Sequence, residues 1–514
     1  MSNCLATWLS PFDITAPSVR INELHTDNRT VGEGDVFIAL SQQREQVKQH
    51  TAQAIKNKVA AVLIDEQFLA EIKAVESYPS TPIIGIKALK QQHASLIQAY
   101  YADAFNAMQS GSLPVLAVTG TNGKTSVTQL IAQILLKADK RVGVIGTMGE
   151  GIYPEFRPTL NTTPGIAENL RIITRFLEEQ ADVVCMEVSS HALDQGRVAG
   201  FKFVSAAITN ITHDHLDYHE TFEHYATTKQ SLFTSGYSQK SLLNLDDALI
   251  NQWYQQGICS DVMSIGRVST DTTHSKTTLG FSDVIYHPGG IRFNLHIDQQ
   301  CFAIESPLFG GFNIYNLMTA IGQILQAGLM SMEDTIAAIK TLSPVAGRAE
   351  PFPPAWSKGA GVIVDYAHTP DALEKMLTAA REHTTARLIC VFGCGGDRDK
   401  EKRPAMGEIA AKLADFIIVT NDNPRSESPD AIAEQVVTGI PGSKRSRVEV
   451  ILDRVEAIKY GLSMLADGDV LVIAGKGHET YQEFACGRVE YDERALVREL
   501  TAQTSAPESG GLHV

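Results

Sequence analysis

Short apolar runs alternate with stretches of helical periodicity along the first part of the chain. Strands are expected at residues 36–40, 60–64 and 83–86, and helices at residues 46–58 and 89–107. Apolar runs of this length, separated by amphipathic helical patterns, are typical of a sheet covered by helices. Residues 1–108 are therefore predicted to form a small α/β domain. Residues 109–114, which contain Gly, Ser and Pro, are predicted to be a linker.

The middle of the chain, residues 109–342, predicts a larger parallel sheet. Strand-like apolar runs lie at 115–118, 141–145, 182–188 and 206–209, with helical patterns between the earlier ones. This order is typical of a doubly wound sheet. Residues 255–305 differ, because their short β-type runs predict an antiparallel extension. Helices are expected afterwards at 312–327 and 331–341.

The third predicted domain spans residues 343–514. Its expected strands are 361–364, 386–392, 416–420 and 470–473, and each ends in a polar loop that contains glycine or proline, apart from the first, which ends in Asp365-Tyr366-Ala367-His368. Ligands bind open α/β sheets outside the carboxyl ends of the strands, so these loops are expected to face one site. The tail from about Thr501 is predicted to be disordered.

The predicted fold class is therefore α/β with three domains. A small N-terminal α/β domain precedes a central P-loop-type doubly wound parallel sheet and a C-terminal Rossmann-like α/β domain. The length of 514 residues agrees with this division, since domains commonly hold roughly 100–200 residues.

Composition narrows the class of protein. The net charge of −15 argues against broad nucleic-acid binding, because no surplus of Lys and Arg can neutralise phosphates. No apolar run approaches the roughly 20 residues of a membrane helix, so no membrane insertion is expected. The N-terminus lacks a basic region followed by an apolar stretch, which indicates a cytoplasmic protein. The seven cysteines are scattered and predict reduced thiols.

A glycine-rich turn at the end of the run 115–118 carries the most information. Glycines let backbone N–H groups close around an anion, Lys124 adds a positive charge, and the Thr125 hydroxyl can hold Mg²⁺. Thr119 stands where the standard phosphate loop has its first glycine, so the match is to a shorter variant. A nucleoside triphosphate is the predicted ligand. The predicted cradle consists of Gly120, Thr121, Asn122, Gly123, Lys124, Thr125 and Ser126.

Two further segments of the middle domain are candidates for a metal site. Glu187 follows an apolar run, and His215 lies in a His/Asp-rich segment at 210–219. On its own, the segment is equally consistent with a hydrogen-bonded loop. Zinc is a further possibility, but the segment lacks the helical His pair of the metalloproteases. With a phosphate loop upstream, Mg²⁺ is favoured, although imidazole is an unusual Mg²⁺ ligand. Taken on its own, Lys229, on a predicted helix, would be expected to be an ordinary solvated lysine, because nothing in composition or spacing singles it out.

The loops of the third domain suggest an amino-acid site. Arg398 and Arg425 match a carboxylate, since guanidinium pairs with it at two points. Asp422, Asn423 and Glu479 could accept hydrogen bonds from ammonium groups. The alternative is a set of surface ion pairs at strand ends. The glycines at 393–396 are too closely spaced for a dinucleotide fingerprint, so NAD is not expected.

Several motifs together resemble the Mur ligases of peptidoglycan synthesis. They occur in the family's order at residues 119–126, 187–191, 210–219, 313–316, 347–350, 365–370 and 453–454. The resemblance implies a three-domain, ATP-dependent amide ligase that takes a uridine nucleotide, ATP and an amino acid. It implies that ATP converts a D-glutamate γ-carboxylate into an acyl phosphate, which the incoming amine attacks. The implied partners are small molecules only, and a monomer is expected.

The resemblance also implies roles for particular residues. ATP would meet the phosphate loop together with Asn316, Arg348, Asp365 and Arg454, and Mg²⁺ would bind Thr125, Glu187, His215 and Lys229. The uridine-nucleotide acceptor, UDP-N-acetylmuramoyl-L-alanyl-D-glutamate, would meet Asn28, Thr162, Thr163, Ser190, Gln195 and Arg197. Lys229 falls where the family carries a carbamylated lysine. The segment 422–425 matches the motif for meso-diaminopimelate, implying a site of Arg398, Asp422, Asn423, Pro424, Arg425, Gly475 and Glu479.

Arg425 separates this prediction from its alternatives. Diaminopimelate differs from lysine by one extra carboxylate, which needs a cationic partner, and the lysine-adding relatives lack this arginine. Addition of lysine, addition of glutamate as in folylpolyglutamate synthetases, and a nucleotide-binding module without catalysis remain open. The first domain departs most from the family pattern: Asn28 stands where serine is common, and residues 41–51 lack the usual glycine. His213 stands where arginine is common.

Overall fold

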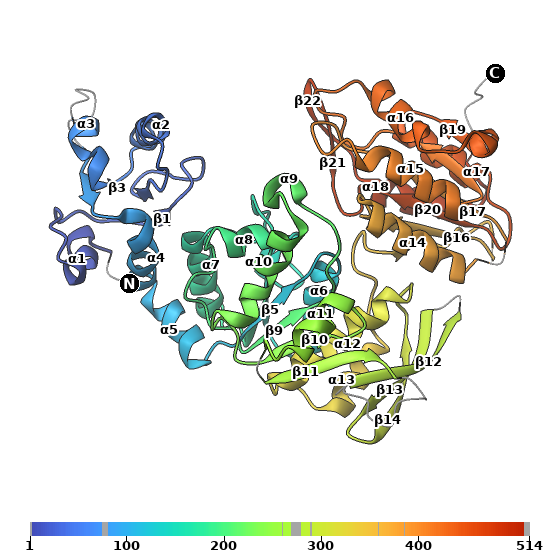
Figure 1. The fold of residues 1–514 in the computed structure, drawn as a ribbon, viewed down its shortest axis with the longest axis horizontal. Helices are drawn as coiled ribbons and strands as arrows, with labels where there is room; N and C mark the ends of the chain where they lie inside the picture. Colours follow the sequence, from blue (N-terminus) through green and yellow to red (C-terminus); the bar gives the residue numbers. More distant parts are fainter. Residues whose placement is uncertain are drawn as a thin grey trace.

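The protein consists of three α/β units that follow one another along its long axis (Figure 1). The computed structural model describes residues 3–73, 81–259, 261–268, 279–287, 290–357, 359–384 and 386–507. Each unit has its own sheet, covered by helices, which confirms the predicted α/β class. No helix within these residues is long and apolar enough to cross a bilayer.

The first unit holds a four-stranded parallel sheet. Its strands, in spatial order, are β1 (Leu24–His25), β2 (Val36–Ile38), β3 (Ala61–Asp65) and β4 (Ile83–Ile86). The helices flanking them are α2 (Arg44–Lys56), α4 (Leu89–Tyr100) and α5 (Ala102–Ser110). The helix expected over 89–107 is thus two helices, interrupted at Tyr101, whose buried hydroxyl accepts a hydrogen bond from the Leu24 N–H at 3.2 Å. Helix α5 also extends into the predicted linker.

The second unit is built on a ten-stranded sheet. Its parallel centre contains β5 (Val115–Thr119), β6 (Val142–Gly146), β8 (Val183–Glu187), β9 (Ser205–Ile208) and β10 (Ser241–Asn244). Every residue of these strands is buried, which explains why their sequences are mainly apolar, with polar residues only at the strand ends. Helices α6 (Lys124–Leu136) and α12 (Phe312–Gln326) share one apolar core on one face. Helices α7 (Ile166–Glu178) and α10 (Phe222–Thr234) contribute to the core that also reaches the first unit.

The edges of this sheet differ in part from the prediction. The antiparallel extension is confirmed for β12 (Leu279–His287), β13 (Gly290–Ile297) and β14 (Gln300–Ser306). Strand β11 (Val262–Arg267), however, pairs in parallel with both β10 and β12. Residues 260, 269–278 and 288–289 of the predicted extension lie outside the described residues. At the opposite edge, β7 (Gly149–Ile152) pairs antiparallel to β6 and was not predicted.

The third unit has a six-stranded sheet. Its strands, in spatial order, are β15 (Glu350–Pro351), β16 (Gly361–Asp365), β20 (Val470–Ala474), β17 (Leu388–Phe392), β18 (Phe416–Val419) and β19 (Val448–Val450). All pairings are parallel except that of β15. The hairpin of β21 (Tyr481–Phe484) and β22 (Gly487–Glu490) and helix α18 (Glu493–Thr501) complete the unit. Thr501 ends α18 and is 4% exposed, so disorder does not begin there as predicted.

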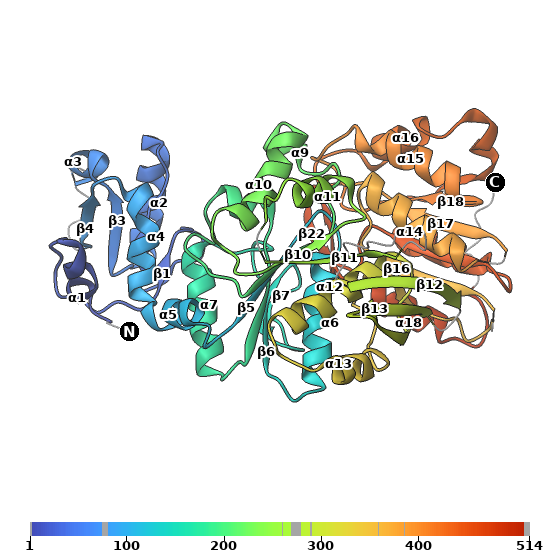
Figure 2. The same cartoon turned by 60° about the horizontal axis from the view of Figure 1, so that its bottom comes forward.

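The second unit contacts both neighbours through helices. Helices α5 and α7 lie side by side between the first and second units (Figure 2). On the other side, α14 (Pro370–Glu382) packs against the segment that precedes α12, where the Phe309 and His383 rings stack with centroids 3.9 Å apart. The carboxyl ends of β5 and β16 face the space between the second and third units, where Asn122 and Asp365 line one cavity.

Candidate active site

The phosphate loop joins β5 to α6 and needs glycine at two positions. Gly120 and Gly123 have φ of +134° and +91°, a region that other residues rarely adopt. A Cβ at Gly120 would lie 2.0 Å from Thr209 Oγ1, so the neighbouring strand end also excludes a side chain. Helix α6 begins at Lys124, so its first N–H groups lack intrahelical partners and face the loop. This arrangement is an anion-binding site.

Two lysines converge on this loop. Lys124 Nζ donates to the carbonyl oxygens of Gly120 at 2.9 Å and Thr121 at 2.8 Å. Lys229, on α10, is 1% exposed and its Nζ also donates to the Gly120 carbonyl, at 3.0 Å. Burial and the charge of Lys124 hold the pKa of Lys229 well below its ordinary value, and burial also lowers the pKa of Lys124. The expectation of a solvated Lys229 is therefore wrong.

Glu187 ends β8 beside the loop and is 1% exposed. Its carboxylate accepts hydrogen bonds from Thr125 Oγ1 at 3.1 Å, from Thr147 N at 2.9 Å and from Thr147 Oγ1 at 3.1 Å. Within the described residues no Lys or Arg forms an ion pair with it. A hydroxyl and a buried carboxylate without a cationic partner are the oxygen donors that suit Mg²⁺, so Thr125 and Glu187 fit the predicted ion.

His215 is less closely associated with this pair. It precedes the short helix α9 (Leu216–His219) with φ of 53°, and its ring centroid lies 4.9 Å from that of His191. Its nearest acidic partner is Asp214, at 3.6 Å between Nε2 and Oδ2. The structure thus brings Lys124, Lys229 and Glu187 to the loop, whereas His215 makes no direct hydrogen bond with Glu187.

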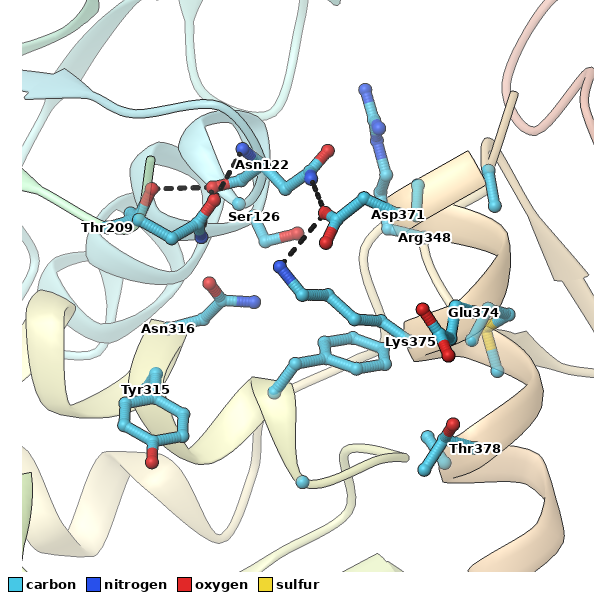
Figure 3. A pocket seen from close by; sticks show the side chains of 18 of the residues that line it. Asn122, Ser126, Thr209, Tyr315, Asn316, Arg348, Asp371, Glu374, Lys375 and Thr378 are labelled. Carbon is cyan, nitrogen blue, oxygen red and sulfur yellow. Dashed lines mark hydrogen bonds and ion pairs between the residues drawn. The ribbon is translucent and has the colours of Figure 1, made fainter. Parts of the chain in front are cut away.

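A cavity of about 610 Å³ opens between the second unit and α14 (Figure 3). It contains several of the predicted nucleotide contacts: Asn122, Gly123, Ser126, Asn316, Arg348 and Asp365. Asn316 packs closely against the phosphate loop, because a Cβ on Gly123 would lie 2.5 Å from Asn316 Oδ1. The Arg348 guanidinium lies 4.4 Å from the centroid of the Tyr366 ring. The cavity therefore extends from the phosphate loop to the third unit.

Arg454 does not line this cavity. Its side chain is fully buried and pairs with Glu493, with 2.5 Å between Nε and Oε2. It also donates to the carbonyl oxygens of Asn421 at 3.1 Å and Ala474 at 2.9 Å. Arg454 thereby connects α17 (Arg454–Ser463) to α18, a contact that the sequence pattern does not indicate.

Asp371 and Lys375 are cavity residues that the sequence interpretation missed. Asp371 Oδ2 accepts hydrogen bonds from Asn122 Nδ2 at 2.8 Å and Lys375 Nζ at 2.9 Å (Figure 3). It also accepts a hydrogen bond from Thr212 Oγ1 at 3.1 Å. Asp371 thus connects the first turn of α14 to the phosphate loop across the boundary between two units. The available signal was an acidic residue directly after the N-cap Thr369 and Pro370 of a predicted helix start.

A second cavity, of about 510 Å³, lies between the first and second units. Three of the residues that were predicted to contact the uridine-nucleotide substrate line this cavity: Asn28, Gln195 and Arg197. Thr163 is buried nearby and its carbonyl accepts a hydrogen bond from Arg197 at 2.8 Å, while its hydroxyl donates to the Glu187 carbonyl at 2.8 Å.

The two remaining predicted acceptor contacts lie between this cavity and the phosphate loop. Thr162 Oγ1 lies 3.1 Å from Thr147 Oγ1, which in turn donates to Glu187. Ser190, at the start of α8 (Ser190–Asp194), is 1% exposed and its hydroxyl has no hydrogen-bond partner within the described residues. The contacts of Thr162 therefore link the wall of the second cavity to Glu187, at the edge of the phosphate site.

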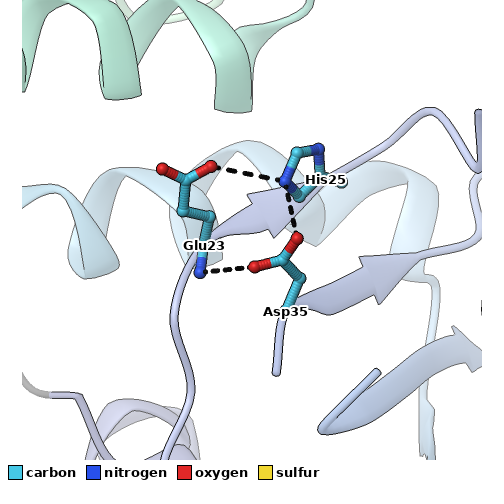
Figure 4. A group of neighbouring side chains, drawn as sticks. All are labelled: Glu23, His25 and Asp35. Atoms are coloured by element: carbon cyan, nitrogen blue, oxygen red, sulfur yellow. Dashed lines mark hydrogen bonds and ion pairs between the residues drawn. The ribbon is translucent and has the colours of Figure 1, made fainter. Parts of the chain in front are cut away.

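Glu23, His25 and Asp35 form an acidic cluster beside the second cavity (Figure 4). His25 Nε2 lies 3.2 Å from Asp35 Oδ2 and 3.5 Å from Glu23 Oε2. Arg171, on α7, supplies the balancing cation, at 2.5 Å from Glu23. The cluster is therefore an ion network that joins the first unit to the second, and it was not found from the sequence.

The residues that were predicted to bind the amino-acid substrate lie together at the carboxyl ends of β17, β18 and β20. Asn423 Nδ2 donates to Glu479 Oε2 at 3.1 Å, and a Cβ on Gly475 would lie 3.0 Å from Asp422 Oδ2. The Tyr366 hydroxyl, from the fourth loop, donates to Glu479 Oε1 at 3.4 Å. The four loops thus share one site, as predicted.

Arg425 and Arg398 lie at the other side of this site. Arg425 Nε donates to Glu483 Oε2 at 3.1 Å and its NH1 to the Gly396 carbonyl at 2.7 Å. Its second terminal nitrogen, NH2, has no hydrogen bond within the described residues. Pro424 lies against the glycine loop, where a Cβ on Gly396 would come 1.9 Å from the Pro424 carbonyl oxygen. Arg398 is exposed and free of ion pairs in the described part of the chain.

Comparisons with known proteins match most of the chain to Mur ligases. Residues 118–324 match the Mur ligase middle domain, and residues 347–477 match the Mur ligase glutamate ligase domain. A UDP-N-acetylmuramoyl-L-alanyl-D-glutamate–2,6-diaminopimelate ligase of Vibrio vulnificus (strain YJ016) is 36% identical over 508 residues, which cover 98% of this chain and 99% of that one.

Solved structures give the same result. A structure of a UDP-N-acetylmuramoyl-L-alanyl-D-glutamate–2,6-diaminopimelate ligase has a TM-score of 0.65 and 32% identity, covering 96% of this chain and 98% of its own. MurF from Acinetobacter baumannii shares the fold at 17% identity, with a TM-score of 0.63 and coverage of 91% and 95%. With the phosphate loop and its two lysines in place, the chain belongs to the Mur ligase family.

Proposed function

We propose that this protein is an ATP-dependent ligase that adds meso-2,6-diaminopimelate to UDP-N-acetylmuramoyl-L-alanyl-D-glutamate. The observation that carries this proposal is the Arg425 guanidinium, whose NH2 makes no hydrogen bond within the described residues and which lies across the shared loop site from the paired Asn423 and Glu479. The 36% identical Vibrio vulnificus relative, which bears the name of this ligase, supports it. The reaction belongs to peptidoglycan synthesis, and we propose a cytoplasmic, monomeric enzyme with domains at 1–108, 109–342 and 343–514.

The chemistry requires activation of the acceptor. A free carboxylate is a poor electrophile, so ATP first phosphorylates the γ-carboxylate of D-glutamate. The amine of diaminopimelate then attacks the acyl phosphate, a C–N bond forms, and inorganic phosphate leaves with the C–O bonding pair. The phosphate loop and Lys124 hold the transferring phosphoryl group and balance its charge. The remaining ATP contacts that we propose are Asn316, Arg348 and Asp365. Arg454 would act indirectly, because it is buried in an ion pair with Glu493 and does not line the cavity.

Mg²⁺ is the proposed metal cofactor. Thr125 and Glu187 would hold it, with His215 as a third ligand, and it would neutralise charge on the ATP phosphates. Thr147 holds the Glu187 carboxylate through its backbone and hydroxyl, so that one orientation is kept.

The second cavity is the proposed site of the uridine-nucleotide acceptor. Asn28, Gln195 and Arg197 line it, and Arg197 is tied to Thr163. Thr162 lies further along, toward Glu187, and Ser190 offers a buried hydroxyl without a hydrogen-bond partner in the described residues. An acceptor with its nucleotide in this cavity could extend its dipeptide past Thr162 to the phosphate loop, which would place the γ-carboxylate beside the γ-phosphate of ATP.

Lys229 is proposed to be carbamylated. Burial lowers the pKa of the Lys229 amine, so it loses its proton more readily than a solvated lysine, and the unprotonated amine is nucleophilic. The unprotonated nitrogen would attack CO₂ and form an N–C bond while one C=O bonding pair moves onto oxygen; loss of one N–H proton to solvent then leaves a carbamate anion. The anion would balance Lys124, since both lysines reach the Gly120 carbonyl, and would complete the metal ligand set.

A product assay tests the proposed function. The purified protein is incubated with ATP, Mg²⁺, the acceptor and one of meso-diaminopimelate, lysine or glutamate, and product mass is measured. We expect one product, with diaminopimelate, and phosphate release that requires both the acceptor and this amino acid. A lysine or glutamate adduct as the main product, or ATP turnover without either substrate, would contradict the proposal. ATP binding with no adduct would indicate a module without catalysis.

A further inference from the structure

Lys476 is a fully buried cation between the two loops that carry the proposed amino-acid residues. It follows Gly475 at the end of β20 and is 0% exposed. Its Nζ lies 2.5 Å from Glu479 Oε2, 2.8 Å from Asn423 Oδ1 and 3.7 Å from Asp422 Oδ1. Three residues of the predicted site thus meet on one ammonium group, which the sequence interpretation did not include.

This ammonium group sets the orientation of the Asn423 amide. An ammonium only donates, so the amide atom that faces it must be the oxygen. The Glu483 N–H also donates to Asn423 Oδ1, at 2.9 Å, which reinforces this orientation. Asn423 Nδ2 is thereby turned toward Glu479 Oε2, at 3.1 Å, and its second hydrogen remains available to a ligand carboxylate.

Lys476 also sets the charge at this side of the site. Asp422 is 6% exposed and Glu479 is close by, so without a cation two carboxylates would share a poorly hydrated space and repel each other. One lysine leaves a net charge of one negative unit, which matches a single ligand ammonium. The Tyr481 ring, centred 5.0 Å from Nζ, lies over the lysine head and limits its access to water.

We propose that Lys476 is a positioning residue for the amino-acid substrate. It has no exposed surface, so it acts through Asn423 and Glu479 rather than on the ligand. It holds the carboxylate that receives the substrate ammonium and the amide that receives the substrate carboxylate. This inference rests on the proposed function, because it assumes that the loop site binds the incoming amino acid.

Substitution of Lys476 separates positioning from a general structural role. In Lys476→Met, the Asn423 amide loses one of its two orienting donors, keeping only the Glu483 N–H, and Glu479 loses its cation. We expect the KM for diaminopimelate to rise at least tenfold, while the KM values for ATP and the acceptor stay within about twofold. Lys444→Met is the matched control: Lys444 Nζ also donates to a carbonyl oxygen in the third unit, that of Ala411 at 2.6 Å, away from the loop site. The control should leave all three KM values unchanged.

A double-mutant cycle adds a second readout. Glu479→Gln removes the charge that Lys476 compensates, so the effect of Lys476→Met on the KM for diaminopimelate should be several-fold smaller in the Glu479→Gln background. Lys476→Gln, which donates without charge, replaces Lys476→Met if the latter does not fold. An unchanged KM for diaminopimelate, equal rises for all three substrates, or additive effects would each overturn the proposal. Should the wild-type protein ignore diaminopimelate, the proposed function itself fails, which is a distinct result.

Discussion

Lys124 and Lys229 donate to the same carbonyl oxygen, that of Gly120, at 2.9 and 3.0 Å. Two cations this close destabilise each other unless an anion lies between or replaces one of them. Lys124 lies at the start of α6, where ATP phosphates would supply such an anion, whereas Lys229 is buried and forms no ion pair with a carboxylate in the described residues. This pair of lysines connects the nucleotide site to the proposed carbamate.

The first prediction concerns Lys229. Lys229→Met keeps the length of the side chain but cannot form a carbamate, so turnover should fall by about 10²-fold, the usual scale for a lost electrostatic contact in an active site. Phosphate release under saturating substrates measures it. Lys137→Met, on the exposed end of α6, is the control and should retain activity.

The carbamate itself predicts a dependence on CO₂. Wild-type enzyme equilibrated in CO₂-free buffer should lose activity and regain it with bicarbonate, while Lys229→Met should respond to neither treatment. Full activity of Lys229→Met would refute the role of this lysine.

The second prediction concerns Arg425. Arg425→Ala removes the guanidinium proposed to bind the extra carboxylate, a charged hydrogen bond worth about 1.5–3 kcal/mol, so kcat/KM for diaminopimelate should fall by roughly 10- to 100-fold. The KM for ATP should stay close to wild type. Arg488→Ala is the control, because Arg488 also contacts Glu483, at 3.5 Å, but is largely exposed. Equal losses for ATP and diaminopimelate would contradict the assignment.

The third prediction concerns Asp371. Its carboxylate joins α14 to Asn122 and Thr212, and thereby fixes the third unit against the phosphate loop. Asp371→Ala should raise the KM for ATP and lower kcat by about 10-fold in total, on the scale of one or two lost hydrogen bonds to a charged group. Steady-state kinetics measure both constants. Glu374→Ala, on the same helix and cavity wall, should have little effect; a similar loss there would point to a general effect of charge.

The fourth prediction concerns the pH dependence of stability. Burial lowers the pKa of His25, but hydrogen bonds to Asp35 and Glu23 outweigh it and raise the pKa above its ordinary value. A raised folded-state pKa stabilises the fold below the unfolded value of about 6.5, and this contribution is lost as pH rises through the folded pKa. The nearby Arg171 opposes the shift but also pairs with Glu23.

Thermal unfolding tests this sign. The wild-type midpoint should fall between pH 6 and pH 8.5 by more than that of His25→Asn, which keeps a polar side chain but does not titrate. His50→Asn, on the wall of the same cavity, should follow the wild-type curve. Parallel curves for His25→Asn and wild type would exclude the contribution of His25.

The sequence by itself determined the local features of this protein. The buried strand β5, the glycine loop and the start of α6 follow from neighbouring residues, because backbone conformation at Gly120 and Gly123 and burial of an apolar run are local properties. The same holds for the loops after β17, β18 and β20, whose polar residues were predicted to converge because parallel strands present their carboxyl ends on one edge.

Tertiary structure alone decided which polar side chains are buried and with whom. Lys229 lies 109 residues from the Gly120 carbonyl, Arg454 lies 39 residues from Glu493, and Lys476 lies 53 residues from Asn423. A lysine or arginine is ordinarily solvated, and burial requires partners that only the packing of distant elements supplies. The parallel pairing of β11 has the same origin, since strand direction in a sheet depends on the path of the connection and not on the apolar pattern of the strand.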